Sequence, residues 1–300
     1  MALKGDSSRK SKTALGVLML TSVGVTEEDP GVRVDDPVGP KLLRWRDGMF
    51  AVGRMPRCHP LFRRAVERSD PGAYGFMIAR LKYMDDVIRE KLGEGVRQFV
   101  VLGAGYDTRS YRMRDALSAA RVFEVDLPAM SQDKQARLAR ALGGLPSYVE
   151  FVDVDFNEEK FSDRLVERGL DVSLPTLFLL SGVSMYLPRE AVLELLSQVA
   201  GRFGAGSSLL FDYFFAGVME SPERYRGGSQ WVARARRAGE EPRFGLEMDD
   251  ARSLLDSCGL RLETQCDMAE LAERYLKRSD GTKVPDPYDF AAVAYAVVKE

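Results

Sequence analysis

The chain has 300 residues, 45% of them hydrophobic, which is enough for one large α/β domain with additions. Its formal net charge of −2 supplies no overall field that would attract nucleic acid or an anionic membrane, so neither is an expected partner. The three cysteines, Cys58, Cys258 and Cys266, have neither metal-ligand spacing nor partner histidines. The longest N-terminal apolar run, Leu15–Leu20, is far shorter than the roughly 20 residues that span a bilayer. These features predict a cytoplasmic protein with reduced cysteines, no metal and no membrane span.

The N-terminal part precedes every predicted strand. Residues 1–25 are expected to be disordered or loosely ordered, since the first of them are rich in Ser and Lys. Between Thr26 and Pro40, the Pro, Gly and Asp residues predict an irregular connection that leads into a short helix near Lys41–Trp45. We expect residues 26–73 to fold over the carboxyl edge of the sheet as a helical lid.

Apolar residues recur every three or four positions between Tyr74 and Leu92, which predicts an amphipathic helix. Arg80 lies on or at the margin of its apolar face, where an unpaired guanidinium would be costly. An anion is therefore expected beside Arg80. The carboxylate of a ligand is one candidate, and the alternatives are a structural Asp or a guanidinium that reaches water.

The segment Phe99–Arg109 combines an apolar run with a glycine turn. Its first four residues predict a central parallel strand that is covered on both faces. Gly103 and Gly105 then form a turn where a ligand can approach the backbone, and Asp107 or Thr108 would suit the N-cap of the next helix. A dinucleotide loop would carry glycine at position 108, so Thr108 favours S-adenosylmethionine over a nicotinamide cofactor.

Acidic residues end the next two predicted strands. Asp126 closes the strand Arg121–Asp126, and an acid at this point usually accepts hydrogen bonds from ribose hydroxyls. Asp155 and Phe156 end the third strand, where they could hold the amino group and the ring of an adenine. Asp155 could equally cap a helix, because Asn and two Glu residues follow Phe156.

Beyond Asp126 the predicted helices and strands alternate, which indicates an α/β fold with a doubly wound, Rossmann-like sheet. Seven strands, mostly parallel and with a late hairpin-like pair, favour a methyltransferase over a dehydrogenase. One domain is expected over residues 26–300: the lid 26–73, a cofactor-binding core 74–215, an acceptor-side insertion 216–247 after strand five, and C-terminal strands 248–300. The later strands are predicted at 148–155, 176–180, 208–214, 261–266 and 291–299, and the later helices at 130–142, 158–168, 188–203 and 248–258.

Candidates for the acceptor pocket follow strands four and five. Tyr186 lies in Ser181–Pro188, a segment that lines the pocket or is only a tight turn. Tyr213 ends strand five and either faces the acceptor or fills the core. Arg243 and Phe244, in the insertion, are candidates for the pocket rim.

His59 is the single histidine and thus the one imidazole that could act as a general base. A lone histidine in an N-terminal loop is more often structural. Tyr186 and Tyr213 are the other candidates, so no catalytic residue is assigned from the sequence.

With these residues in view, the chain resembles the leucine carboxyl methyltransferase family, in particular its bacterial branch of class I S-adenosylmethionine-dependent methyltransferases. The resemblance covers roughly residues 30–298 and follows the order of the family's motifs. The matching stretches are D-D-P-V-G-P-K-L-L, A-R-L-K-Y-M-D-D, V-L-G-A-G-Y-D-T-R-S-Y-R, F-E-V-D-L-P, V-S-M-Y-L-P, E-E-P-R-F-G-L and P-Y-D-F-A-A-V-A.

The resemblance implies a set of cofactor-binding residues. Arg80 would hold the cofactor carboxylate, Gly103 its amino-acid part and Asp126 the ribose. Ser181 departs from the family, which commonly has Glu there, and a serine cannot neutralise an ammonium group. The remaining members of the set are Asp155 and Phe156 at the adenine, with Ala104, Gly105, Asp107 and Leu127.

The implied activity is O-methylation by direct in-line displacement. A carboxylate of a small molecule or a peptide terminus is the expected acceptor, and it needs no base because it is ionised at neutral pH. A phenolic or enolic hydroxyl of a secondary metabolite is the alternative and does require a base. A noncatalytic S-adenosylmethionine-binding protein is a further alternative, motivated by Ser181.

Overall fold

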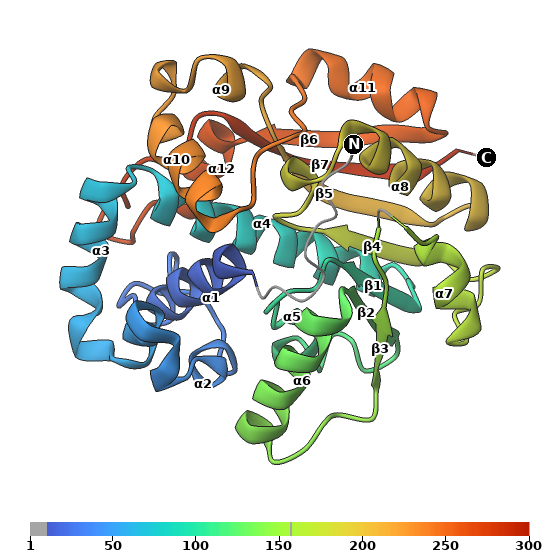
Figure 1. Cartoon of the computed structure of the whole chain (residues 1–300), viewed down its shortest axis with the longest axis horizontal. Helices are drawn as coiled ribbons and strands as arrows, with labels where there is room; N and C mark the ends of the chain where they lie inside the picture. The colour runs from blue at the N-terminus through green and yellow to red at the C-terminus, as the bar shows by residue number, and fades with distance from the viewer. Residues whose placement is uncertain (1–10, 157, 300) are drawn as a thin grey trace.

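A computed structural model describes residues 11–156 and 158–299 of the chain. Its centre is one sheet with the strand order β3-β2-β1-β4-β5-β7-β6, in which β7 is antiparallel to both neighbours and the other pairs are parallel (Figure 1). The strands are β1 Gln98–Leu102, β2 Arg121–Asp126, β3 Val149–Asp153, β4 Thr176–Leu180, β5 Ser208–Phe214, β6 Leu260–Asp267 and β7 Ala291–Val298. The predicted α/β class and the mostly parallel seven-stranded sheet are confirmed, and β3 ends two residues earlier than expected.

Helices cover both faces of this sheet (Figure 1). Alternate residues of the central strands belong to two separate buried clusters, with Phe99 and Val101 in one and Val100 and Leu102 in the other. The helices are α1 Lys12–Gly24, α2 Gly39–Leu42, α3 His59–Ser69, α4 Ala73–Gly93, α5 Arg109–Arg112, α6 Pro128–Leu142, α7 Phe161–Glu167, α8 Arg189–Arg202, α9 Gly217–Glu220, α10 Gly228–Ala238, α11 Met248–Ser257 and α12 Met268–Tyr275, with short 3-10 helices η1 Trp45–Arg54, η2 Pro56–Cys58, η3 Ser184–Tyr186 and η4 Pro222–Arg224.

The helix α1 departs from the expectation that residues 1–25 lack firm order. Ser11 caps it by accepting a hydrogen bond from the Ala14 N–H at 2.9 Å, and Leu15, Leu18 and Val23 are buried in the core. The apolar run at its start was too short for a membrane span but long enough to bury one helix face. The rest of that expectation, residues 1–10, lies outside the described residues.

Buried polar contacts tie the N-terminal segment to the sheet layer. Thr108, just after the glycine turn, donates a hydrogen bond to Asp36 Oδ2 at 2.6 Å. Arg137 of α6 holds both oxygens of Asp47, at 2.6 and 2.9 Å, and its Nε donates to Asp133 at 2.5 Å. The region predicted as a lid is therefore anchored at two places.

None of the helices in the described ranges combines the length and the apolar composition that a membrane span requires.

Candidate active site

The glycine turn after β1 and the acid after β2 lie side by side. In the sheet register, Leu102 of β1 stands between Val125 of β2 and Leu180 of β4, so the residues that follow these strands share one edge. Gly103 and Gly105 have φ values of +65° and +43°, which side chains with a Cβ rarely adopt.

A close contact adds to the requirement for glycine at position 103, whereas at position 105 the positive φ alone explains the glycine. A Cβ at Gly103 would lie 2.5 Å from Val183 Cγ2, in the segment that follows β4. Ala14 of α1 covers the second glycine, since its Cβ would stand 3.5 Å from a Cβ on Gly105. The turn is thus closed on one side by the post-β4 segment and on another by α1.

Asp126 is bound to the same turn. Its Oδ2 accepts a hydrogen bond from the Gly105 N–H at 2.5 Å, and its Oδ1 accepts one from the Leu127 N–H at 2.7 Å. Burial raises the pKa of Asp126 to about 6, although both hydrogen bonds and the charge of Lys134 act in the opposite direction. The structure therefore brings together the predicted residues Gly103, Gly105, Asp126 and Leu127, and places Ala104 between the two glycines.

The helix expected after the turn is short, and of the two predicted capping residues Asp107, not Thr108, accepts a hydrogen bond from its first turn. Only Arg109–Arg112 are helical, and the Thr108 side chain makes no cap hydrogen bond. Asp107 Oδ1 instead accepts a hydrogen bond from the Arg109 N–H at 2.8 Å, and its other oxygen forms an ion pair with the Arg109 guanidinium. Burial would raise the pKa of Asp107, but the charges of Arg109 and Lys134 keep it below its ordinary value.

Arg80, in the middle of α4, meets an anion of the protein itself. Its Nη1 lies 2.6 Å from Asp212 Oδ2, and the two side chains are 6% and 0% exposed. Its guanidinium also stands over the Phe76 ring, with Cζ 4.7 Å from the ring centroid. Arg80 Nε is buried without a hydrogen-bond partner among the described residues. The structural Asp that the sequence left open as an alternative is thus present, and one donor of Arg80 remains unused.

Asp212 is a site residue that sequence reasoning missed. Besides pairing with Arg80, its Oδ1 accepts a hydrogen bond from the Gly182 N–H at 2.6 Å, and its backbone oxygen accepts one from Ser184 Oγ at 2.7 Å. It therefore joins α4, β5 and the segment that follows β4. The available signal was an acidic residue inside the otherwise apolar strand Leu209–Phe214.

Asp155 and Phe156 follow β3 in a turn. The Asp155 carbonyl accepts hydrogen bonds from the N–H groups of Glu158 and Glu159 at 3.0 and 2.9 Å. The Phe156 ring is half-buried and packs edge-on against Phe161, with a centroid distance of 6.2 Å. Ser181 is half-buried directly after β4. The predicted contacts of these three residues with a cofactor stay predictions.

Two acceptor candidates belong to the core instead. Tyr213 is fully buried, donates its hydroxyl to Gln265 Oε1 at 3.0 Å and packs on Phe211 in the cluster opposite α4. Phe244 is 1% exposed in the same cluster. For Tyr213 the reason is strand alternation: Asp212 faces Arg80, so the next residue of β5, Tyr213, points to the other face of the sheet.

The other two candidates lie near each other. Tyr186 is half-buried in η3, and burial, reinforced by Glu240, raises the pKa of its hydroxyl. The Arg243 backbone N–H donates to the Met185 oxygen at 2.8 Å, and its side chain is exposed. Arg243 is therefore attached to the segment after β4, and its role at a pocket rim stays a prediction.

His59 is structural in this arrangement. It is 1% exposed, its Nδ1 lies 2.7 Å from Thr26 Oγ1 and its Nε2 lies 3.1 Å from the Val52 oxygen. Burial lowers its pKa, so the imidazole is neutral at neutral pH. Both ring nitrogens are engaged within the N-terminal segment, which argues against the base role.

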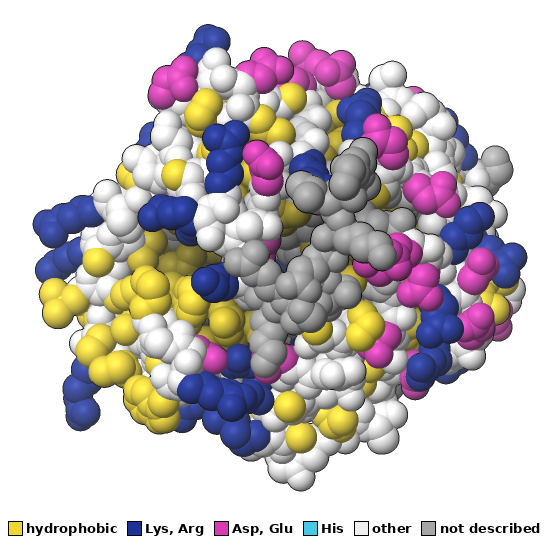
Figure 2. Space-filling view, in the orientation of Figure 1, with side chains coloured by type: hydrophobic (Ala, Val, Ile, Leu, Met, Phe, Trp, Pro, Cys, Tyr) yellow, Lys and Arg dark blue, Asp and Glu magenta, His cyan; other side chains and the backbone are white. Residues whose placement is uncertain are grey.

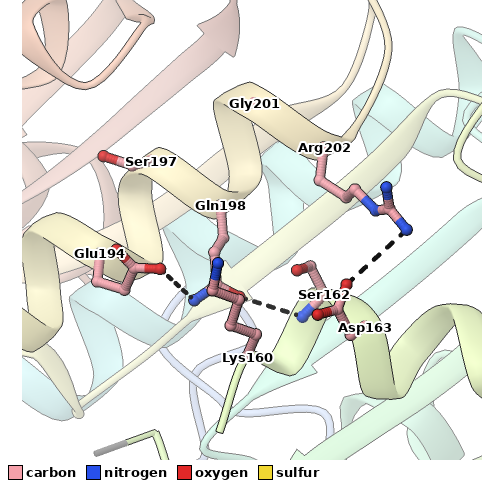
Figure 3. A pocket seen from close by; sticks show the side chains of 8 residues that line it. All are labelled: Lys160, Ser162, Asp163, Glu194, Ser197, Gln198, Gly201 and Arg202. Atoms are coloured by element: carbon pink, nitrogen blue, oxygen red, sulfur yellow. Dashed lines mark hydrogen bonds and ion pairs between the residues drawn. The ribbon is translucent and has the colours of Figure 1, made fainter.

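A surface depression between α7 and α8 contains none of the predicted site residues (Figure 3). Its polar groups bind one another: Gln198 Nε2 donates to Glu194 at 3.1 Å, the Ser162 N–H donates to Gln198 at 3.2 Å, and Arg202 lies 3.8 Å from Asp163. The depression is explained by the packing of these two helices.

Comparison with solved structures supports the fold. A methyltransferase-like protein from Thermobifida fusca superposes with a TM-score of 0.60 at 16% identity, covering 98% of this chain and 97% of that one. A protein of the DUF574 family from Streptomyces avermitilis gives a TM-score of 0.57 at 18% identity, over 80% of this chain and 90% of that one.

Sequence comparison identifies the relatives. YktD from Bacillus subtilis, provisionally named an S-adenosyl-L-methionine-dependent methyltransferase, is 33% identical over 61% of this chain, and the match spans 60% of YktD's own length. A Streptomyces coelicolor protein with the same provisional name is 31% identical over 74% of this chain and 76% of its own length. The relatives agree with the cofactor and the enzyme class predicted above. The leucine carboxyl methyltransferase family model matches residues 17–200, and the chain belongs to this family of S-adenosylmethionine-dependent methyltransferases.

Proposed function

We propose that the protein is an S-adenosylmethionine-dependent O-methyltransferase that methylates a carboxylate of a small molecule or of a peptide terminus. The observation that carries the proposal is the shared edge formed by the glycine turn, Asp126 and the segment after β4. The cationic Arg80 and the carboxylate of Asp126 fit the two polar ends of such a cofactor, namely its amino-acid carboxylate and its ribose hydroxyls.

Each cofactor-binding role follows from local geometry. Arg80 has an unpaired Nε that can donate to a carboxylate while Nη1 stays on Asp212. Asp126 is held by two backbone N–H groups, which leaves lone pairs of its oxygens for ribose hydroxyls. When bound, S-adenosylmethionine supplies an activated methyl group on a sulfonium. The full proposed set is Arg80, Gly103, Ala104, Gly105, Asp107, Asp126, Leu127, Asp155, Phe156 and Ser181.

The carboxylate acceptor is favoured by the shortage of bases. A carboxylate is already ionised at neutral pH, so the protein has only to orient it and exclude water. His59 is engaged in the lid, and a raised pKa keeps the Tyr186 hydroxyl protonated. Tyr186 can therefore donate a hydrogen bond to an acceptor but is a poor proton acceptor. Arg243, exposed beside it, offers a cation to an anionic acceptor.

Two measurements test this function in sequence. Calorimetric titration of S-adenosylmethionine, S-adenosylhomocysteine and NAD should show binding of the first two alone, and no binding of either would contradict the proposed pocket despite the family membership. A panel of carboxylates and phenols is then incubated with the enzyme and a methyl-labelled cofactor. Alkali should release labelled methanol from the product, as it does from esters. An alkali-stable product would establish the phenol or enol alternative.

A further inference from the structure

The segment Trp45–Ser69, which forms η1, η2 and α3, exposes an unusual number of apolar side chains. Trp45, Met49 and Leu61 are 65%, 69% and 70% exposed, and Met55 is 39% exposed. These are four of the seven large hydrophobic side chains that are exposed in the described part of the chain. Figure 2 shows hydrophobic side chains gathered over the N-terminal helices at the left, with Lys and Arg around them. Such a cluster marks a contact surface.

The exposed charged side chains of the same segment are mostly positive. Residues 44–68 contain seven arginines and two acidic residues, a formal charge of +5 in a chain whose total is −2. Neither acid is fully exposed: the Asp47 side chain, paired with Arg137, is 5% exposed, and Glu67 is half-buried beside the Gly72 N–H. The exposed arginines of the segment, none of which has an ion-pair partner among the described residues, are Arg46, Arg57, Arg64 and Arg68.

Apolar and basic side chains are exposed together on α3 and on η1, two elements that contact each other. On α3, the exposed residues Leu61, Arg64, Ala65 and Arg68 follow the spacing of a single helix face. On η1, Trp45, Arg46 and Met49 are exposed together. This set, called here the arginine–apolar face, consists of Trp45, Arg46, Met49, Met55, Arg57, Leu61, Arg64 and Arg68.

We propose that the arginine–apolar face docks on an anionic lipid bilayer. Tryptophan and aliphatic side chains among arginines are the combination that binds peripherally to anionic bilayers. The near-neutral charge of the whole chain gave no reason to expect this, because the acidic remainder hides the local excess.

The shape of this face favours a bilayer over an acidic protein. Protein interfaces bury their anchors in fitted pockets, whereas Trp45, Met49 and Leu61 are each about two-thirds exposed and stand among exposed arginines. A fluid bilayer accepts such side chains without a matching surface. An acidic protein partner is therefore an outcome that the test must be able to detect.

The two tryptophans give a direct test on the full chain. Trp45 is 65% exposed and Trp231 is 2% exposed, so a change in environment on docking comes from Trp45. We expect vesicles of phosphatidylcholine with phosphatidylglycerol to shift the tryptophan emission to the blue and to co-sediment the protein, whereas phosphatidylcholine alone does neither. The shift should vanish in Trp45→Phe and weaken at high salt, since exposed charges are screened.

Matched charge variants separate this face from general basicity. Arg46→Gln, Arg57→Gln and Arg64→Gln together should weaken vesicle binding by about 100-fold, roughly fivefold for each arginine. The control triple, Arg224→Gln, Arg237→Gln and Arg252→Gln, has the same net charge and alters other exposed arginines. Circular dichroism confirms that both triples fold.

Three results would overturn the proposal. The first is no vesicle binding, and the second is equal loss of binding in both triples. The third is binding of polyglutamate or self-association through this face without vesicle binding, because either assigns the surface to a protein partner. Cofactor binding by calorimetry is independent of all three, so failure here leaves the proposed methyl transfer standing.

Discussion

Arg80 and Asp212 are the residues whose pairing gives the site its charge pattern. The pair is almost fully buried, so removing one partner strands the other in a low dielectric. Arg80 has two explanations: it only holds Asp212, or it also holds the cofactor. The double variant Arg80→Met with Asp212→Asn separates them, because it removes both charges at once.

If Arg80 holds the cofactor, both Arg80→Met and the double variant should bind S-adenosylhomocysteine roughly 10- to 100-fold more weakly, the value of a charge-assisted hydrogen bond. Calorimetry measures the affinity, and thermal melts measure the stability. A double variant that regains wild-type affinity would show that Arg80 is structural only.

Asp126 predicts a pH dependence of cofactor binding. Burial raises its pKa to about 6, so its carboxylate is lost as the pH falls through 6. If ribose hydroxyls require the ionised form, affinity for S-adenosylhomocysteine should be about tenfold lower at pH 5 than at pH 7. Asp126→Asn should bind more weakly and show a flat profile; a wild-type profile without the step would contradict the assignment.

The raised pKa of Asp126 also affects the stability of the fold: the group stabilises the folded state below pH 4, and this contribution is lost as the pH rises through 6.

His59 should prove dispensable for chemistry. Its two nitrogens bind Thr26 and the Val52 carbonyl, so His59→Ala should lower the melting temperature by several degrees through lost hydrogen bonds and packing. The rate of methyl transfer at a temperature where the variant is folded should stay within about twofold. A loss of 100-fold or more, with cofactor binding intact, would restore the base hypothesis.

At the scale of elements, the N-terminal segment is held by a few buried ion pairs. Arg137 of α6 reaches Asp47 of η1 with two hydrogen bonds, and both side chains are at most 5% exposed. Arg137→Ala should therefore destabilise the protein by about 3–5 kcal/mol in urea unfolding and speed proteolysis within residues 43–58. Arg168→Ala, which breaks the exposed pair with Glu150, should cost below about 1 kcal/mol. An equal loss in the free energy of unfolding for the two variants would mean that the buried Arg137–Asp47 pair stabilises the protein no more than an exposed ion pair does.

The elements also show where sequence reasoning was sufficient. Tyr74–Leu92 was predicted as a helix, and Ala73–Gly93 is helical, because a long apolar period is a local signal. In contrast, the chain around α1 contains only a short apolar run, which by its own pattern does not indicate a helix. Its helix is stabilised by burial against α4 and η1, which a local pattern does not contain.

At the scale of the molecule, the site is an edge shared by strands that are distant in sequence. Parallel strands place their carboxyl ends together, so the glycine turn, Asp126 and Ser181 could be assigned to one edge from the sequence. The arginine–apolar face, in contrast, could not be predicted from the overall composition. The net charge of the chain averages the positive charge of this segment with the acidic remainder. Vesicle binding tests the arginine–apolar face, and calorimetric titration of the cofactor tests the strand edge that carries the glycine turn and Asp126.

Local periodicity and motifs in a fixed order were enough to predict the fold class, the family and the strand edge that carries the glycine turn and Asp126. Which side chains meet one another became clear only from the folded chain. Arg80 and Asp212 lie 132 positions apart in the sequence and are joined because α4 packs on the face of β5 that carries Asp212. The same alternation places Tyr213 in the core, and the contacts of both His59 ring nitrogens with Thr26 and Val52 are visible only in the folded N-terminal segment. Long-range pairing depends on which faces pack together, and no local pattern specifies that.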